Sequence, residues 1–294
     1  MALRYELACI GAGNMAEGIV AAVVGKGLYT PGAIAVSDPA PGRRELFARR
    51  FGVTVMEDNR RLAAESRRII LAVKPQAFND VAAGIADLVT GEQLFISIMA
   101  GKSARSIAAA LAGGGSREGI PAGEGARRDS RTSEAGTVRV VRVMPNLPIL
   151  VGAGMAGICG GAAATARDIA EVQAIFNAGG GSVVVPDESL MDAVTAVSGS
   201  GPAYFYYFVE AMVEGGKACG LAEADALELA KFTCLGAARM MLETGESPAE
   251  LRAKVTSKGG TTQAALESMS QAGVDARIRD AVVAAFNRGR ELAG

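Results

Sequence analysis

Two glycine-rich segments at opposite ends of the chain hold the residue types best suited to chemistry. The first is Gly11-Ala12-Gly13-Asn14-Met15-Ala16, and the second is Thr256-Ser257-Lys258-Gly259-Gly260-Thr261-Thr262. Backbone N–H groups that converge around glycines bind anions. The first segment therefore predicts a binding site for a pyrophosphate, and the second predicts a binding site for a single carboxylate.

The first segment has the G-x-G-x-x-A spacing of a dinucleotide-binding turn. Gly11 permits a sharp turn after a short apolar strand at residues 7–10, and Gly13 has no side chain where a pyrophosphate approaches the backbone. Ala16 is small enough for the following helix to pack against that strand. A plain tight turn has the same spacing, but Asp38, at the end of the next predicted strand, supports the nucleotide interpretation.

The choice of dinucleotide stays open at this stage. Asp38 would accept a hydrogen bond from the ribose 2′-OH of NADH and would repel the 2′-phosphate of NADPH. Arg43 and Arg44 follow at the start of the next predicted helix and could offset that repulsion. Both NADH and NADPH are therefore candidates.

The second segment places hydroxyl groups beside a flexible backbone. Two glycines let several N–H groups converge, while Ser257, Thr261 and Thr262 add hydroxyls at the start of the next helix. Such a loop suits one carboxylate without a fixed cation. The alternative is an ordinary helix cap after a glycine turn, which the local sequence alone favours.

Two further segments lie at predicted strand ends, where open α/β sheets bind ligands. Lys74, within Ala72-Val73-Lys74-Pro75, is a candidate for a phosphate or ribose contact, with a solvated lysine as the alternative. Asn146 supplies a neutral donor and acceptor after Met144-Pro145. Ser198 and Ser200 lie in a glycine-rich stretch, but the chain has no histidine to activate either of them.

Composition excludes several classes of function. The chain has 294 residues, a formal net charge of −1 and no histidine, so nothing favours nucleic acid, an anionic membrane or His-ligated zinc, and no metal site is predicted. Its four cysteines form no C-x-x-C pair, and the N-terminus lacks the order of a signal peptide. The uncharged stretch at residues 144–166 contains proline and many glycines, which indicates buried strand and loop. We expect a cytoplasmic protein with reduced thiols.

Strands alternating with helices must position these segments. Short apolar runs predict a doubly wound, parallel, Rossmann-type sheet in a first domain, residues 1–188. The predicted strands are 7–10, 34–37, 53–55, 69–73, 94–98, 138–144, 155–159 and 183–185. Residues 113–136, rich in Gly, Arg, Ser and Glu without apolar periodicity, predict a mobile insertion.

A second domain, residues 189–294, is predicted to be all helical. Its expected helices are 189–197, 201–219, 222–243, 248–254, 262–271 and 275–292. The helix at 222–243 is apolar on more than one face, which one chain of this size could not bury. We therefore expect a homodimer formed through helices.

In this order, these segments resemble the pyrroline-5-carboxylate reductase family over nearly the whole chain apart from residues 113–136. The most specific stretches are Val197-Ser198-Gly199-Ser200-Gly201-Pro202-Ala203-Tyr204, Glu210-Ala211, and Ser257 to Thr262. The resemblance implies a Rossmann domain, a helical dimerisation domain that exchanges elements between subunits, and often rings of dimers. It also implies reduction of 1-pyrroline-5-carboxylate to L-proline by NADPH or NADH.

The resemblance implies specific site residues by position. The cofactor would be lined by Gly11, Ala12, Gly13, Asn14, Met15, Ala16, Asp38, Asn59, Ala72, Val73, Lys74, Pro75 and Ala100. The substrate would be held by Ser257, Gly260, Thr261 and Thr262, and we expect the catalytic hydrogen bond to the ring nitrogen to come from Thr262. The chain departs from the family pattern at Lys258, where proline is usual, at Leu147, where threonine is usual, and at Met99, where a small residue is common.

Two alternatives are retained. A β-hydroxyacid dehydrogenase has the same two-domain plan and needs a lysine near the substrate hydroxyl, for which Lys217 and Lys231 are candidates. A non-catalytic dinucleotide-binding protein would bind cofactor without turnover.

Overall fold

The computed structural model describes residues 3–113 and 137–293, so nearly all of the predicted insertion at 113–136 lies outside the described residues. The chain forms two compact units. Unit 1 comprises residues 1–199 and 286–294, and unit 2 comprises residues 200–285. Unit 1 holds all the strands of the described chain, and unit 2 is helical, as predicted.

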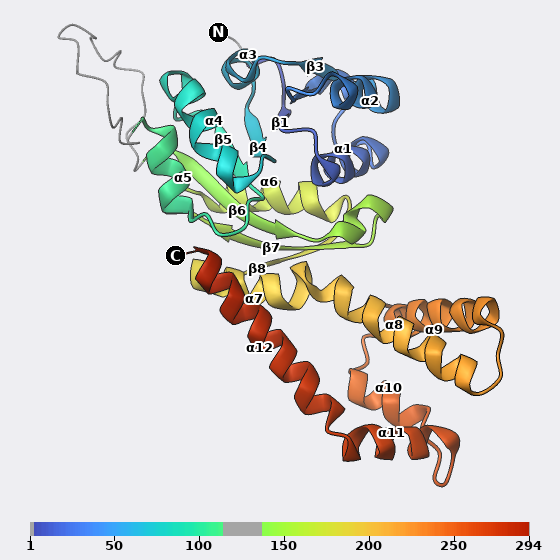
Figure 1. Ribbon diagram of the computed structural model, residues 1–294. Coiled ribbons are helices and arrows are strands. Elements are labelled where there is room, and N and C mark those ends of the chain that lie inside the picture. The colour runs from blue at the N-terminus through green and yellow to red at the C-terminus, as the bar shows by residue number, and fades with distance from the viewer. Residues whose placement is uncertain (1–2, 114–136, 294) are drawn as a thin grey trace, which may run out of the picture. The chain divides into compact units, whose positions relative to one another are not determined.

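One eight-stranded sheet organises unit 1, with strand order β3-β2-β1-β4-β5-β6-β7-β8 (Figure 1). The strands are β1 Leu7–Ile10, β2 Ile34–Ser37, β3 Thr54–Met56, β4 Arg68–Leu71, β5 Leu94–Ser97, β6 Arg139–Pro145, β7 Gly154–Gly160 and β8 Gly180–Val184. All neighbouring pairs are parallel except β6 and β7, which are antiparallel. The order reverses direction between β1 and β4, which is the position where doubly wound sheets bind ligands.

Helices cover both faces of this sheet (Figure 1). They are α1 Asn14–Gly25, α2 Pro41–Phe51, α3 Asn59–Ala64, α4 Phe78–Ile85, α5 Ala104–Leu111, α6 Ala166–Asn177 and α7 Met191–Val194. Alternate residues of β1 point to opposite faces: Leu7 and Cys9 join a core with α1, α2 and α6, whereas Ala8 and Ile10 join a core with α3, α4 and α5. Burial on both faces explains why these strands are continuous apolar runs.

Unit 2 contains the helices α8 Gly201–Ala218, α9 Glu223–Thr244, α10 Pro248–Lys254 and α11 Thr261–Gln271, and most of α12 Val274–Ala293. Helices α8 and α9 pack on each other through Val213, Ala226 and Ala230, which are the buried residues of a small core. A capping box between Ser247 and Glu250 starts α10. None of the helices in the described parts of the chain is both long and apolar enough to cross a bilayer.

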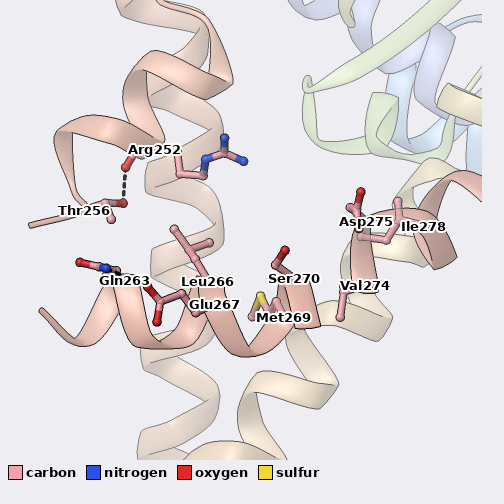
Figure 2. Close-up of a pocket in the computed structure, with 10 residues that line it drawn as sticks. All are labelled: Arg252, Thr256, Gln263, Leu266, Glu267, Met269, Ser270, Val274, Asp275 and Ile278. Atoms are coloured by element: carbon pink, nitrogen blue, oxygen red, sulfur yellow. Dashed lines mark hydrogen bonds between the residues drawn. The ribbon is translucent and has the colours of Figure 1, made fainter. Parts of the chain in front are cut away.

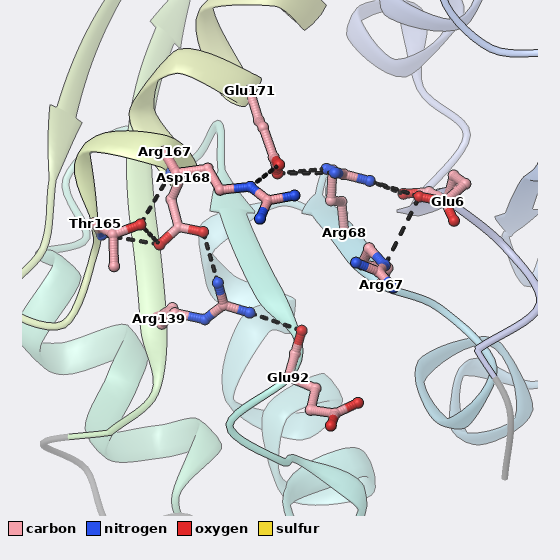
Figure 3. A network of polar contacts seen from close by, with 9 residues as sticks. All are labelled: Glu6, Arg67, Arg68, Glu92, Arg139, Thr165, Arg167, Asp168 and Glu171. Atoms are coloured by element: carbon pink, nitrogen blue, oxygen red, sulfur yellow. Dashed lines mark hydrogen bonds and ion pairs between the residues drawn. The ribbon is translucent and has the colours of Figure 1, made fainter.

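Charged side chains at the starts of the strands hold the elements of unit 1 together (Figure 3). Arg68, at the start of β4, lies 2.9 Å from Glu6, which precedes β1, and 2.8 Å from Glu171 in α6. Arg139, at the start of β6, donates to Asp168 at 2.7 Å. Because these are amino ends of parallel strands, the network lies away from the ligand-binding edge and stabilises the fold.

The segment that joins the two units differs from its prediction. The expected single helix at 189–197 is broken into a 3-10 turn, Glu188–Leu190, the short α7, and a π-helical turn, Thr195–Gly199. A Cβ on Gly199 would lie only 2.7 Å from the Met144 side chain, so the π-helical turn packs closely against β6. The predicted domain boundary after residue 188 falls at the start of this segment, and the contact-based boundary falls at its end.

Candidate active site

The glycine turn after β1 is held in a conformation that only glycine adopts easily. Gly11 has φ +101°, and a Cβ there would lie 2.6 Å from the carbonyl oxygen of Ala72. The Gly11 N–H donates to the backbone carbonyl of Ser37, and the Ala72 N–H donates to the backbone carbonyl of Ile10. The turn is therefore packed between the ends of β2 and β4.

The next glycine opens the turn toward solvent. Gly13 is the N-cap of α1, and a Cβ there would have nothing within 4 Å. The N–H groups of Asn14, Met15 and Ala16 have no intrahelical partner, because the first helical bond runs from the Glu17 N–H to Gly13. Exposed backbone and unpaired N–H groups at a helix start fit a pyrophosphate.

The other predicted cofactor residues gather at the same edge of the sheet. Parallel strands β2, β1, β4 and β5 are neighbours, so the segments that follow them end side by side. These segments contain Asp38 after β2, Ala72 to Pro75 after β4, and Ala100 after β5. Lys74 and Ala100 are exposed, and Ala72, Val73 and Pro75 are half-buried. Asn59 begins α3 and accepts a hydrogen bond from the Ser37 hydroxyl at 2.7 Å.

Asn146 is engaged within the protein. Its Oδ1 accepts from the Met155 N–H at 2.8 Å, and its Nδ2 donates to the carbonyl and hydroxyl oxygens of Ser198 at 3.2 and 3.3 Å. This side chain fastens the end of β6 to the π-helical turn. Of the two unusual residues nearby, Met99 is buried in the core and Leu147 is half exposed.

The segment predicted to bind the substrate forms a tight loop between α10 and α11 in unit 2. The Gly260 N–H donates to the Ser257 carbonyl at 3.0 Å, and Gly259 has φ +71°, which favours glycine. A Cβ on Gly260 would lie only 2.4 Å from the Ser257 hydroxyl, so the absence of a side chain lets that hydroxyl turn inward. The loop thus brings Ser257 toward the start of α11.

Helix α11 supplies the remaining donors of this loop. It begins at Thr261, so the N–H groups of Thr261, Thr262 and Gln263 have no intrahelical partner. Thr262 is half-buried, while Thr261 and Lys258 are exposed. Together with the Ser257 hydroxyl, these groups can bind an anion of the size of one carboxylate.

Gln263, the third residue of α11, supports the loop and was not predicted from the sequence. Its Oε1 accepts from the Gly259 N–H at 2.7 Å, and its Nε2 donates to Glu267 at 2.7 Å. A glutamine at the third helical position commonly reaches back to cap the residues before the helix, and this signal could have identified it. Gln263 therefore holds the glycine turn in place.

A groove of about 590 Å³ lies beside the loop, between α10, α11 and α12 (Figure 2). Its wall includes Thr256 and Gln263, which flank the loop, and the apolar residues Leu266, Met269 and Ile278. Thr256 is fixed by a hydrogen bond from its hydroxyl to the Arg252 carbonyl at 2.6 Å. The lining of the groove is mainly apolar, so the groove is suited to packing against another apolar surface.

A glycine turn at the switch point of a doubly wound sheet, followed by a helical unit with a glycine-rich loop at a helix start, is the plan of a dinucleotide-dependent oxidoreductase. Comparisons with known proteins agree with this class. A family model for pyrroline-5-carboxylate reductase dimerisation matches residues 188–292, and one described as NADP oxidoreductase, coenzyme F420-dependent, matches residues 6–101.

Similar proteins span the full length of the chain. The pyrroline-5-carboxylate reductase of Synechocystis sp. is 39% identical and aligns over 99% of both chains, and that of Methanosarcina acetivorans is 39% identical over 98% of both. The solved structure of the Coxiella burnetii pyrroline-5-carboxylate reductase is 32% identical, with a TM-score of 0.87 over 99% of both chains. The chain belongs to the pyrroline-5-carboxylate reductase family.

Proposed function

We propose that this protein reduces 1-pyrroline-5-carboxylate to L-proline with NADPH or NADH. The observation that carries the proposal is the loop at residues 257–262, where the Ser257 hydroxyl lies next to the start of α11 and the N–H groups of Thr261, Thr262 and Gln263 have no intrahelical partner. The substrate has one carboxylate for this loop to hold. The reduced dinucleotide supplies the hydride.

The protein's part in this reaction is positioning and electrostatics. A cyclic imine is readily protonated, and the resulting iminium carbon accepts hydride without a strong protein acid. The Thr262 hydroxyl hydrogen-bonds the ring nitrogen, and the Ser257–Thr261 turn holds the carboxylate. This division of labour suits a chain that has no histidine.

The proposed dinucleotide-binding site comprises Gly11 to Ala16, Asp38, Asn59, Ala72 to Pro75 and Ala100. The open backbone at Gly13 and the free N–H groups of α1 support this assignment. The imine held by the substrate loop receives hydride from a reduced dinucleotide that is bound to a Rossmann unit. That unit belongs either to the same chain or to a partner subunit.

The two lysines that could serve a β-hydroxyacid dehydrogenase, Lys217 and Lys231, are both paired with glutamates. Lys217 lies 2.8 Å from Glu214 and 3.4 Å from Glu223, and the hydrogen bond with Glu214 is the main reason that the pKa of Lys217 is raised. Lys231 is paired with Glu228. A lysine that acts as a base near neutral pH needs a lowered pKa, so these pairs disfavour that activity.

A homodimer explains the apolar surface of unit 2. Side chains of α8 and α9 expose large apolar areas, including Tyr207 at 75%, Phe232 at 67% and Leu242 at 84%. Many large apolar side chains exposed on two neighbouring helices are typical of an association surface. We expect α8, α9 and the apolar groove of Figure 2 to be covered by a second copy, and such dimers to assemble into rings. The four free cysteines support a cytoplasmic location.

Replacement of Thr262 tests the catalytic assignment. Thr262→Val keeps the shape of the side chain and removes the hydroxyl, so kcat with 1-pyrroline-5-carboxylate should fall about 10²-fold or more, as for loss of one oriented polar group. Thr262→Ser, which keeps the hydroxyl, is the matched control and should stay within about tenfold of wild type. Unchanged turnover of Thr262→Val would show that another group contacts the ring nitrogen.

A further inference from the structure

The carboxylate of Asp38 is fixed at the edge of the sheet where the adenosine ribose of a dinucleotide binds in this fold. Its Oδ2 accepts from the Ala12 N–H in the glycine turn, and its Oδ1 accepts from the Ala40 N–H, both at 2.8 Å. Asp38 is half-buried. Two backbone donors hold the side chain, and each oxygen keeps a second lone pair for another donor.

The arginine that contacts the glycine turn, Arg43, is engaged by groups of the protein itself. Arg43 donates from Nε to the Ala12 carbonyl at 2.5 Å and from its terminal nitrogen to Glu17 at 2.7 Å. Glu17 also accepts from Arg50 at 2.5 Å, and only 14% of the Glu17 side chain is exposed. The charge of Arg43 is thus compensated inside the protein.

Arg44 is engaged in the same way. It donates to the carbonyl oxygens of Asp38 and Pro39 at 2.6 and 2.9 Å and pairs with Glu57 at 3.3 Å. Only 18% of its side chain is exposed. A 2′-phosphate would therefore compete with these internal partners for either guanidinium.

The charges around the end of β2 therefore cancel. Glu17 pairs with Arg43 and Arg50, and Glu57 pairs with Arg44. The Asp38 carboxylate, which accepts from backbone N–H groups, is the third negative charge beside these three positive ones. A site for a 2′-phosphate normally offers surplus positive charge and free Arg donors. A site for a 2′-hydroxyl needs an acceptor, which Asp38 provides.

We propose that this protein selects NADH over NADPH, and that Asp38 is the residue that determines the choice. This inference rests on the proposed reductase function and deepens it by naming the cofactor. Asp38 accepts the hydrogen bond of the 2′-hydroxyl and repels a 2′-phosphate. Arg43 and Arg44 do not offset the repulsion, because Glu17, Glu57 and backbone carbonyls already hold them.

Direct binding tests the preference without depending on turnover. Isothermal titration of the full chain with NAD⁺ and with NADP⁺ should give a Kd at least about tenfold lower for NAD⁺, as expected for a carboxylate that faces a hydroxyl in one case and a phosphate in the other. The ratio of kcat/KM for NADH and NADPH should have the same direction. Equal or tighter binding of NADP⁺ would overturn the preference, whereas binding of neither dinucleotide would overturn the proposed reductase function itself.

Substitution of Asp38 tests its role. Asp38→Asn and Asp38→Ser should each lower the NAD⁺-over-NADP⁺ preference by about tenfold or more, since both remove the repelling charge. Glu45→Gln removes an equal charge from an exposed position of α2 and should change the preference by less than about threefold. If Glu45→Gln shifts the preference as far as the Asp38 variants, or if the Asp38 variants keep the wild-type ratio, Asp38 is not the determinant.

Discussion

A single methyl group added at Gly260 should weaken binding of the substrate carboxylate by the loop at residues 257–262. Gly260 has φ −85° and ψ 172°, a conformation that alanine adopts without backbone strain. The new Cβ would lie 2.4 Å from the Ser257 hydroxyl, whereas ordinary contacts begin at 3.4 Å. The hydroxyl must therefore move by about 1 Å or rotate to another rotamer.

The size of the effect follows from the bond that is lost. A hydrogen bond to a charged group contributes about 1.5–3 kcal/mol, which corresponds to about 10- to 150-fold in affinity. Gly260→Ala should raise the KM for 1-pyrroline-5-carboxylate by that factor and leave the Kd for the dinucleotide unchanged. Gly84→Ala, at an exposed position of helix α4 with nothing within 4 Å of the added Cβ, is the control and should leave both constants unchanged.

A double-mutant cycle separates this mechanism from general damage to the loop. Ser257→Ala removes the hydroxyl, so the added methyl of Gly260→Ala then meets only the Ser257 carbonyl at 3.2 Å and the Ser257 Cβ at 3.6 Å. The two substitutions should each weaken substrate binding, and the double variant should be little worse than either. Additive losses, or a Gly260→Ala enzyme with a wild-type KM, would refute the reasoning.

Three further predictions concern the dinucleotide-binding site, the stability of the fold and the homodimer. Gly11→Ala, at φ +101° and 2.6 Å from the Ala72 carbonyl, should lower the free energy of unfolding by about 1–3 kcal/mol in urea titrations and weaken dinucleotide binding. Burial opposes ionisation of Glu171, but hydrogen bonds from arginines outweigh it and lower the pKa of Glu171 below 4.5. Its stabilising contribution is thus present above pH 4.5 and lost as the pH falls through the lower folded value. Glu171→Gln should cost about 1–2 kcal/mol near neutral pH and progressively less in acid, while Glu243→Gln, in an exposed pair, should cost under about 0.5 kcal/mol. Phe232→Glu should convert the dimer to monomers in light scattering, because the exposed ring would carry a charge into the interface; a dimer that persists would move the interface elsewhere.

Local patterns in the sequence predicted most of the fold. The strands at 7–10 and 34–37 match β1 and β2 residue for residue, because each is an apolar run that a glycine or turn bounds. The antiparallel direction of β7 was not predicted, although the short connection from Pro145 to Gly154 is too small for the crossover that a parallel pair requires. The segment predicted as one helix at 189–197 is helical, but it changes from a 3-10 turn to an α-helix to a π-helical turn, which periodicity does not reveal.

Sequence patterns located the candidate site and left its side-chain partners undetermined. The glycine turn, Asp38 and the loop at 257–262 depend on local backbone geometry, which glycine spacing indicates. Asn146 was expected to offer donor and acceptor groups to a ligand, but Met155 and Ser198 use them. The engagement of Arg43 and Arg44 was also hidden, because pairs between residues far apart in sequence form only after folding.

The central claim is that the loop at residues 257–262 holds the carboxylate of the imine that is reduced. The most direct test compares kcat/KM for 1-pyrroline-5-carboxylate with kcat/KM for 1-pyrroline, the same ring without its carboxylate, in the wild type and in Gly260→Ala. The wild type should favour the carboxylated ring strongly, and Gly260→Ala should lose activity on that ring alone. Equal losses on both rings, or a wild type that does not distinguish them, would contradict the claim.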